Sequence, residues 1–94
     1  MKMKLSINDY DFLKKYAPDA VAFIDVASIE NENVRFSIIN FDEFAVEHTF
    51  AVLDVGMDDE DTVNEIGKRL YNIYDKILYQ KHQQEEKEKS NDSE

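Results

Sequence analysis

The sequence contains no cysteine, and its 94 residues include only two glycines and one proline. The absence of cysteine excludes a disulfide scaffold, a thiolate nucleophile and a zinc–cysteine site. Two glycines are too few for a glycine-rich loop of the kind that holds phosphate groups. The chain therefore lacks the signatures of several common classes of enzyme.

Long apolar runs are missing as well. No run approaches the roughly 18 residues that a membrane span requires. Asn8, Asp9 and Asp11 interrupt the basic N-terminus before the apolar core of a signal peptide can begin. We therefore expect a cytoplasmic protein with no membrane partner. Hydrophobic residues make up 43% and aromatic residues 12% of the chain, which is enough for a folded core and excludes a wholly disordered protein.

The N-terminal part of the chain predicts one short helix. Ser6 and Asp9 match a capping box, and the apolar residues that follow recur at helical spacing. Pro18 ends the pattern, because a residue before proline is disfavoured in the α conformation. These features predict a helix over 8–17. The alternation of apolar residues at positions 1, 3, 5 and 7 allows a short leading strand as an alternative, which we favour less.

Three segments with strand-like patterns follow the first helix. They cover residues 20–29, 34–38 and 44–53. Polar residues at 30–33 and the pair Asp42 and Glu43 provide the turns between them. Parallel pairing needs a long crossover connection, whereas these links are short. The sequence therefore predicts an antiparallel meander of three strands.

The last predicted element is a long helix from about residue 59 to at least Tyr79, with Asp58 or Asp59 as its N-cap. Its apolar residues cover roughly 160° of the helix surface, which is more than packing on a sheet requires. The predicted fold class is α+β, in the order helix, three-stranded antiparallel meander, long helix, with both helices on one face of the sheet. Residues 1–80 form a single domain, and residues 81–94 form a polar, charged helix extension and a disordered tail.

The negative charge is concentrated in one segment. The formal net charge is −10, from 21 acids and 11 bases. Residues 36–67 contain no lysine or arginine. Their acids are Asp42, Glu43, Glu47, Asp54, Asp58, Asp59, Glu60, Asp61 and Glu65. A contiguous anionic surface of this kind repels nucleic acid and attracts basic protein surfaces. The alternative interpretation is a solvated rim whose aspartates only cap the helix.

The polar residues form no catalytic or metal-binding pattern. An EF-hand loop that began at Asp54 would need glycine at its sixth position, where Asp59 stands. His48 lies on an apolar face and is expected in the core, and His82 has no partner at ligand spacing. The carboxylates lie in exposed, charged contexts, where tuning their pKa for acid–base catalysis is difficult. We therefore expect neither an enzyme nor a cofactor or metal site.

In element order, the chain resembles the double-stranded-RNA-binding domain. That family binds phosphates through lysines at the start of its second helix, whereas Asp58, Asp59, Glu60 and Asp61 stand at the equivalent place here, so direct nucleic-acid binding is not expected. Small size, acidity and element order also resemble some phage-encoded anti-CRISPR proteins, which occupy the DNA-binding surface of a nuclease. This resemblance implies an inhibitor from a phage or mobile element that presents carboxylates as a DNA mimic to a basic nucleic-acid-binding protein.

The residues expected to contact such a partner are the acids of segment 36–67 and one tyrosine. Tyr79 points roughly 160° away from the direction of Val63 on the predicted helix, and tyrosine is enriched in binding hot spots. An alternative function is a small homo-oligomeric structural or assembly protein, such as a homodimer. Its interface would be the apolar stripe of the long helix at Tyr71, Tyr74 and Leu78.

Overall fold

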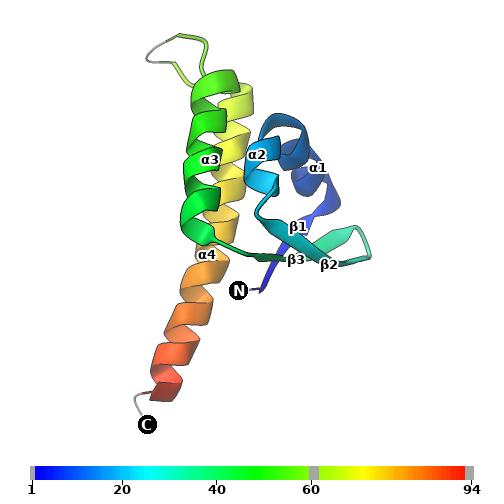
Figure 1. Ribbon diagram of the computed structural model, residues 1–94, viewed down its shortest axis with the longest axis vertical. Helices are drawn as coiled ribbons and strands as arrows, with labels where there is room; N and C mark the ends of the chain where they lie inside the picture. Colours follow the sequence, from blue (N-terminus) through cyan, green and yellow to red (C-terminus); the bar gives the residue numbers. More distant parts are fainter. Residues whose placement is uncertain (1, 60–61, 93–94) are drawn as a thin grey trace.

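Three strands and four helices make up the part of the chain that the computed structural model describes, which is residues 2–59 and 62–92, with side chains described as far as residue 86. In chain order they are β1 (Lys2–Ser6), α1 (Ile7–Tyr16), α2 (Pro18–Val21), β2 (Ile24–Glu30), β3 (Asn33–Ile38), α3 (Phe41–Val55) and α4 (Glu65–Asp92). Figure 1 shows α3 and α4 side by side and antiparallel, with the strands and the two short helices beside this pair. The C-terminal part of α4 extends beyond the rest of the molecule.

The strands form one antiparallel sheet in the order β1-β3-β2. In the register, Met3 of β1 lies opposite Phe36 of β3, and Ile24 of β2 lies opposite Ile38. Asn31 and Glu32 in the turn between β2 and β3 have positive φ angles of 49° and 70°, a conformation that asparagine tolerates well. The predicted α+β class with a three-stranded antiparallel sheet is confirmed, and the predicted strand at 34–38 is its central strand.

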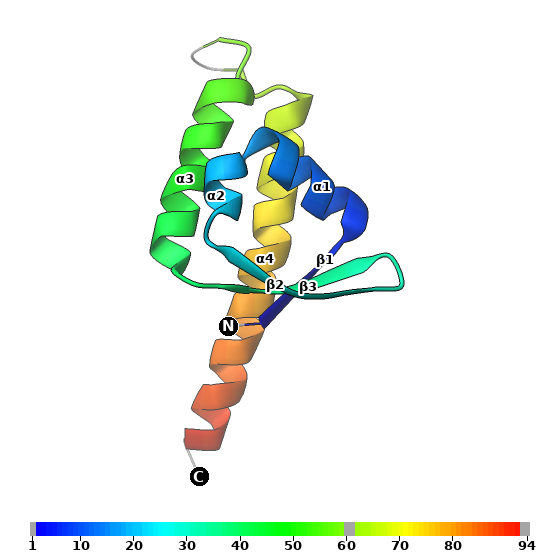
Figure 2. The same ribbon diagram turned by 45° about the vertical axis from the view of Figure 1, so that its right-hand side comes forward.

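Helices α1 and α4 pack against a single face of this sheet, as predicted (Figure 2). The covered face carries the buried side chains Met3, Leu5, Val34, Phe36 and Ile38. Successive side chains of a strand point to opposite faces, so Lys2, Lys4 and Arg35 lie on the uncovered face and are exposed. The apolar face of β1 and β3 therefore forms the floor of the core under α1 and α4.

Helix α1 confirms the helix that the sequence predicts over 8–17. The Ser6 hydroxyl accepts a hydrogen bond from the backbone N–H of Asp9 at 3.1 Å, so the capping residue acts as expected. Pro18 stands at the first position of α2, where its fixed φ suits a helix start. The predicted strand over 20–29 is wrong in its first residues, because Ala20 and Val21 belong to α2 and β2 begins only at Ile24.

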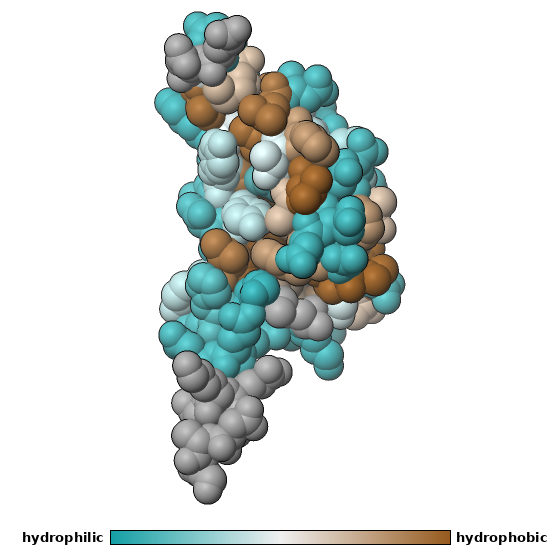
Figure 3. All heavy atoms as spheres, turned by 60° about the vertical axis from the view of Figure 1, so that its left-hand side comes forward, coloured by the Kyte–Doolittle hydropathy of each residue, from teal (hydrophilic) through white to brown (hydrophobic). Residues whose placement is uncertain are grey.

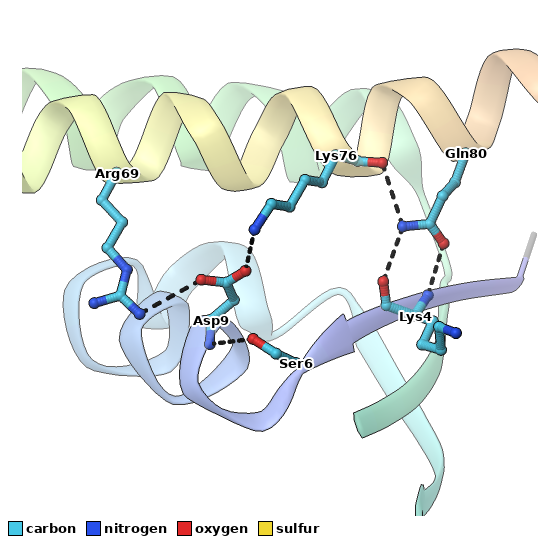
Figure 4. Close-up of polar contacts among 6 residues, drawn as sticks. All are labelled: Lys4, Ser6, Asp9, Arg69, Lys76 and Gln80. Atoms are coloured by element: carbon cyan, nitrogen blue, oxygen red, sulfur yellow. Dashed lines mark hydrogen bonds and ion pairs between the residues drawn. The ribbon is translucent and has the colours of Figure 1, made fainter. Parts of the chain in front are cut away.

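The leading strand, which was the less favoured alternative, is present as β1. Its inner edge pairs with β3, and its outer edge is bonded by a side chain of α4. The amide of Gln80 accepts a hydrogen bond from the Lys4 N–H and donates one to the Lys4 carbonyl, both at 2.8 Å (Figure 4). Gln80 thereby satisfies backbone groups that an edge strand otherwise leaves to solvent.

The prediction of a third strand over 44–53 is wrong, because this segment is the helix α3. The Asn40 side chain accepts a hydrogen bond from the Glu43 N–H at 3.2 Å and caps the helix. Phe44, His48 and Val52 are buried at a spacing of four residues, which is the helical period. Apolar residues occupy both alternating sets of positions here, so burial along one helix face overrides the strand propensity of phenylalanine, valine and threonine.

Helix α4 confirms the predicted long helix but begins later than residue 59. Asp58 and Asp59 are not its caps. The Asn64 side chain instead accepts a hydrogen bond from the Gly67 N–H at 2.9 Å, directly before the first helical residue. Leu70, Ile73 and Ile77 are fully buried. The helix continues to Asp92, into the segment for which the sequence predicts a disordered tail.

Candidate protein-binding face on helix α3

Helix α3 carries three large apolar side chains that the rest of the protein does not cover. Val46, Phe50 and Leu53 are 46%, 58% and 61% exposed. Their spacings of four and three residues place them on one side of the helix, opposite the buried residues Phe44 and His48. We call these three residues the apolar row. Figure 3 shows this side of the molecule, where brown apolar side chains reach the surface between teal hydrophilic ones.

Acidic residues lie along both sides of the apolar row. Glu43, Glu47 and Asp54 follow the side that faces α2, and we call them the acidic flank; Asp42 lies on the other side. None of these four carboxylates forms an ion pair with a cation in the described part of the chain. The structure therefore brings together four of the predicted contact residues around an apolar strip that the sequence interpretation placed inside a sheet.

A hollow of about 250 Å³ opens between the acidic flank and α2. Its lining residues are Tyr16, Ala17, Pro18, Asp19, Glu47, Phe50, Ala51 and Asp54. Three of these residues carry carboxylate groups, and the others are two aromatic residues, a proline and two alanines. Phe50 belongs to both the hollow and the apolar row. The two features are thus parts of one continuous surface.

The other predicted contact residues lie at the far end of α3 and at the start of α4. Asp59 accepts a hydrogen bond from the Thr62 N–H at 3.0 Å, and Asp58 accepts one from the Asn64 side chain at 3.2 Å. Glu65 pairs with Lys68 at 3.3 Å in an exposed contact. These three acids therefore shape the connection between the helices. Glu60 and Asp61 fall outside the described residues.

Tyr79 lies away from the acidic flank. It is 64% exposed, as the helical spacing predicts, and its hydroxyl accepts a hydrogen bond from Gln83 at 2.8 Å. It projects from the portion of α4 that packs beside β1, where Gln80 bonds Lys4. The structure thus places Tyr79 on a different surface from the acids, and its role in a partner contact stays a prediction.

The orientation of α3 is fixed by a buried histidine. The Nε2 of His48 lies 2.9 Å from the Leu70 carbonyl of α4, and its ring lies 5.0 Å from that of Tyr74. Burial lowers the pKa of His48, although the hydrogen bond to Leu70 opposes this effect. The neutral side chain therefore acts as a core group, as the sequence predicts. It turns the opposite side of α3, with the apolar row, toward solvent.

Helix α1, on which Tyr16 stands, is held against α4 by an ion-pair cluster (Figure 4). The almost buried Asp9 carboxylate contacts Lys76 Nζ at 2.6 Å and Arg69 at 3.4 Å. Burial alone would raise the pKa of Asp9, but the hydrogen bonds and charges of Lys76 and Arg69 outweigh it and lower that pKa. This cluster helps to set the position of α1 and α2 and hence of the wall of the hollow.

Two elements of the face were not identified from the sequence. The sequence pattern predicts a strand for the apolar row, and it gives no reason to select Asp19. A signal for the row exists, because Val46, Phe50 and Leu53 repeat at helical spacing inside the segment that lacks bases. No sequence pattern shows that α2 packs beside α3, so the contribution of Asp19 depends on the tertiary structure.

The described residues contain no group of three or more histidine, cysteine, aspartate or glutamate side chains arranged to hold a metal ion. Within the same part of the chain, no helix combines the length and the apolar character needed to cross a membrane. No protein-family model, curated protein or solved structure matches this chain. The geometry of the face is therefore the basis for a functional proposal.

Proposed function

We propose that the protein is a small acidic inhibitor that occupies the basic, nucleic-acid-binding surface of another protein through α3. The observation that carries this proposal is the outward side of α3, where carboxylates that form no ion pair with any described residue surround exposed apolar side chains. Carboxylates held on a rigid helix can take the place of phosphates in contacts with lysine and arginine. A source in a phage or a mobile element, as in anti-CRISPR proteins, belongs to the same proposal.

The two components of the face have different roles in this proposal. The acidic flank and the net charge of −10 speed encounter with a basic surface and make binding sensitive to salt. The apolar row supplies contact area that is largely independent of salt. Charged residues at a protein interface contribute more to specificity and association rate than to affinity, so the apolar row is needed for a stable complex.

A homo-oligomer is the second candidate, and the exposed apolar row is the observation that favours it. In the apolar stripe of α4, Leu70, Ile73 and Ile77 are buried against the rest of the chain, whereas Tyr71 is 49% exposed, so a contact through this stripe stays a prediction. A two-fold dimer through α3 would face the acidic flank of one copy with acids of the other, at a cost from like-charge repulsion. A basic partner removes this cost, and we therefore prefer it.

The test combines charge reversal with competition by DNA. Immobilised wild-type protein is incubated with extract of the source organism, and bound proteins are displaced with duplex DNA. We expect a DNA-binding protein that DNA displaces, and whose DNA binding the purified protein blocks. The triple variant Glu43→Lys, Glu47→Lys, Asp54→Lys should lose this partner.

The matched control is Asp11→Lys, Asp25→Lys, Glu86→Lys, which makes the same change in net charge at exposed positions elsewhere. It should keep the partner. Equal loss in both triple variants would show that only total charge matters and would contradict a specific face. A concentration-dependent dimer in sedimentation, with no partner displaced by DNA, would support the homo-oligomer instead.

A further inference from the structure

We propose that the partner presents a basic amphipathic helix to α3, with apolar side chains against the apolar row and an arginine side chain in the hollow beside α2. This inference rests on the proposed function and adds to it the form of the partner. It follows from the arrangement of the apolar row, the hollow and the acidic flank on neighbouring surfaces.

The shape of the apolar row suits a helix. Leu53 lies seven positions after Val46, which is about 10 Å along the helix axis at 1.5 Å per residue. A partner helix with apolar residues at the same spacings can pack against this row over two turns. The row is narrow and is bordered by acids on both sides. A partner helix therefore needs an apolar stripe between basic residues.

The hollow suits an arginine side chain. Ala17, Pro18, Phe50 and Ala51 provide apolar contacts for the methylene stem, while the Asp19, Glu47 and Asp54 carboxylates can accept hydrogen bonds from the guanidinium group. The planar guanidinium group also stacks on aromatic rings and binds carboxylates through two parallel bonds, which the ammonium group of lysine cannot do. An arginine is therefore the better occupant.

The part of the chain whose side chains the structure describes provides no cation for this position. No lysine or arginine lines the hollow. Lys15 lies over the ring of Tyr16, 5.2 Å from its centroid, but forms no ion pair with the three carboxylates in the described part of the chain. Both arginines of the chain form ion pairs of their own, Arg35 with Glu30 and Arg69 with Asp9. These assignments favour an arginine from a different protein over one from a second copy.

The positions of the apolar row and the hollow determine where the arginine lies on the partner helix. Phe50 can contact both the apolar stripe and the arginine of the partner, since it belongs to the apolar row and also lines the hollow. An arginine that enters the hollow must therefore leave the partner helix next to the apolar side chain that meets Phe50. On a helix, positions three or four residues apart satisfy this requirement.

The experiment uses designed peptides and the full-length protein. The probe is a 15-residue helical peptide with a leucine stripe at spacings of three and four and arginines beside it. One control peptide has the same composition in scrambled order. A second control replaces the central arginine with citrulline, which keeps the shape and removes the charge. Binding is measured by calorimetry and by chemical-shift changes of the ¹⁵N-labelled protein.

We expect the amphipathic peptide to shift resonances of α3 and α2 and to bind at least about tenfold more tightly than the scrambled peptide. The citrulline peptide should bind about fivefold to tenfold more weakly than the probe. In the double variant Glu47→Gln, Asp54→Asn, this preference for arginine should disappear. The matched variant Asp11→Asn, Glu86→Gln should retain it, because its exposed carboxylates lie outside the hollow.

Equal binding of the amphipathic and scrambled peptides would overturn the helix proposal, as would shifts confined to the open face of the sheet. An unchanged preference for arginine in the Glu47→Gln, Asp54→Asn variant would overturn the role of the hollow. These failures are separate from failure of the proposed function, which is decided by the partner that DNA displaces. If the peptide did not bind at α3 and no partner were displaced by DNA, the α3 face would be neither a helix-binding site nor the inhibitory surface.

Discussion

His48 and Leu70 join the two long helices through a buried polar contact: the Nε2 of His48 lies 2.9 Å from the Leu70 carbonyl oxygen. A carbonyl oxygen only accepts hydrogen bonds, so Nε2 carries the proton and donates it. The contact satisfies the histidine while the Phe44 and Tyr74 rings lie beside it at centroid distances of 6.1 Å and 5.0 Å. The neutral histidine is thus part of the core that orients α3.

Protonation of His48 is expected to destabilise the fold. Burial lowers its pKa below the usual 6.5, so the unfolded chain takes up a proton at a higher pH than the folded chain does. The free energy of unfolding should therefore be fully retained above about pH 6.5 and decrease as the pH falls below this value. Urea unfolding between pH 5 and pH 8 measures this effect.

The two histidines provide a control for the pH dependence. His48→Gln should be less stable than wild type at pH 8 and should lose the slope below pH 6.5, whereas His82→Gln should keep that slope. A wild-type free energy of unfolding that is constant from pH 8 to pH 5 would contradict a buried neutral histidine. Asp9 contributes separately, because its pKa is lower in the folded chain than the usual 3.8. Its contribution to the free energy of unfolding is lost only as the pH falls below 3.8 and the carboxylate becomes protonated.

Asp9→Asn is expected to loosen the contact between α1 and α4. The substitution removes the charge that binds Lys76 at 2.6 Å and Arg69 at 3.4 Å. Loss of these charge-assisted hydrogen bonds should lower the free energy of unfolding by about 1–2 kcal/mol. Asp11→Asn, two residues away and exposed, should change stability by less than about 0.5 kcal/mol. Equal effects of the two substitutions would refute the structural role of the cluster.

Alanine at Gly67 or Gly56 is expected to separate α3 from α4. A Cβ atom added at Gly67 would clash with the Gly56 carbonyl oxygen, and one added at Gly56 would lie 2.7 Å from the Gly67 Cα. Glycine to alanine inside a helix normally stabilises by about 1 kcal/mol. Here we expect Gly67→Ala to destabilise by about 1–3 kcal/mol, as overpacking does. Thermal unfolding that shows a gain in stability would contradict the close approach of these helices.

Gln80→Ala is expected to free the outer edge of β1. The Lys4 N–H and carbonyl each lose a hydrogen bond of 2.8 Å when the amide is removed. Hydrogen exchange at the Lys4 amide should become faster, and stability should fall by about 1 kcal/mol. Gln83→Ala removes a neighbouring amide that bonds the Tyr79 hydroxyl and should leave Lys4 exchange unchanged. Slow exchange at Lys4 in Gln80→Ala would show that the side chain is not needed.

The sequence predicts α1, the central strand and the long helix because each has a distinct local signal. Ser6 and Pro18 mark the limits of α1, and the alternation from Val34 to Ile38 marks the central strand. The segment 44–53 has no such signal, since its apolar residues fit either period. Its helical state depends on packing with α4 through His48 and Leu70, which lie 22 positions apart in the sequence.

The sequence predicts the acidic residues of the candidate face but not their arrangement in space. The lack of bases in residues 36–67 identifies Glu43, Glu47 and Asp54 from the sequence alone. Their alignment beside Phe50 requires α3 to be a helix, and the hollow requires α2 to pack against it. Tertiary contacts of this kind leave no local pattern in either segment.

Photo-crosslinking from α3 is the most direct test of the claim that this helix meets a basic partner. A photoreactive benzoylphenylalanine at Leu53 should form an adduct with a DNA-binding protein in extract of the source organism. Duplex DNA and the Glu43→Lys, Glu47→Lys, Asp54→Lys changes should each abolish the adduct. The control position is Ile29 on β2, which is 62% exposed against 61% for Leu53 and should give no such adduct. The same adduct from Ile29, or an adduct from Leu53 that DNA leaves unchanged, would contradict the claim.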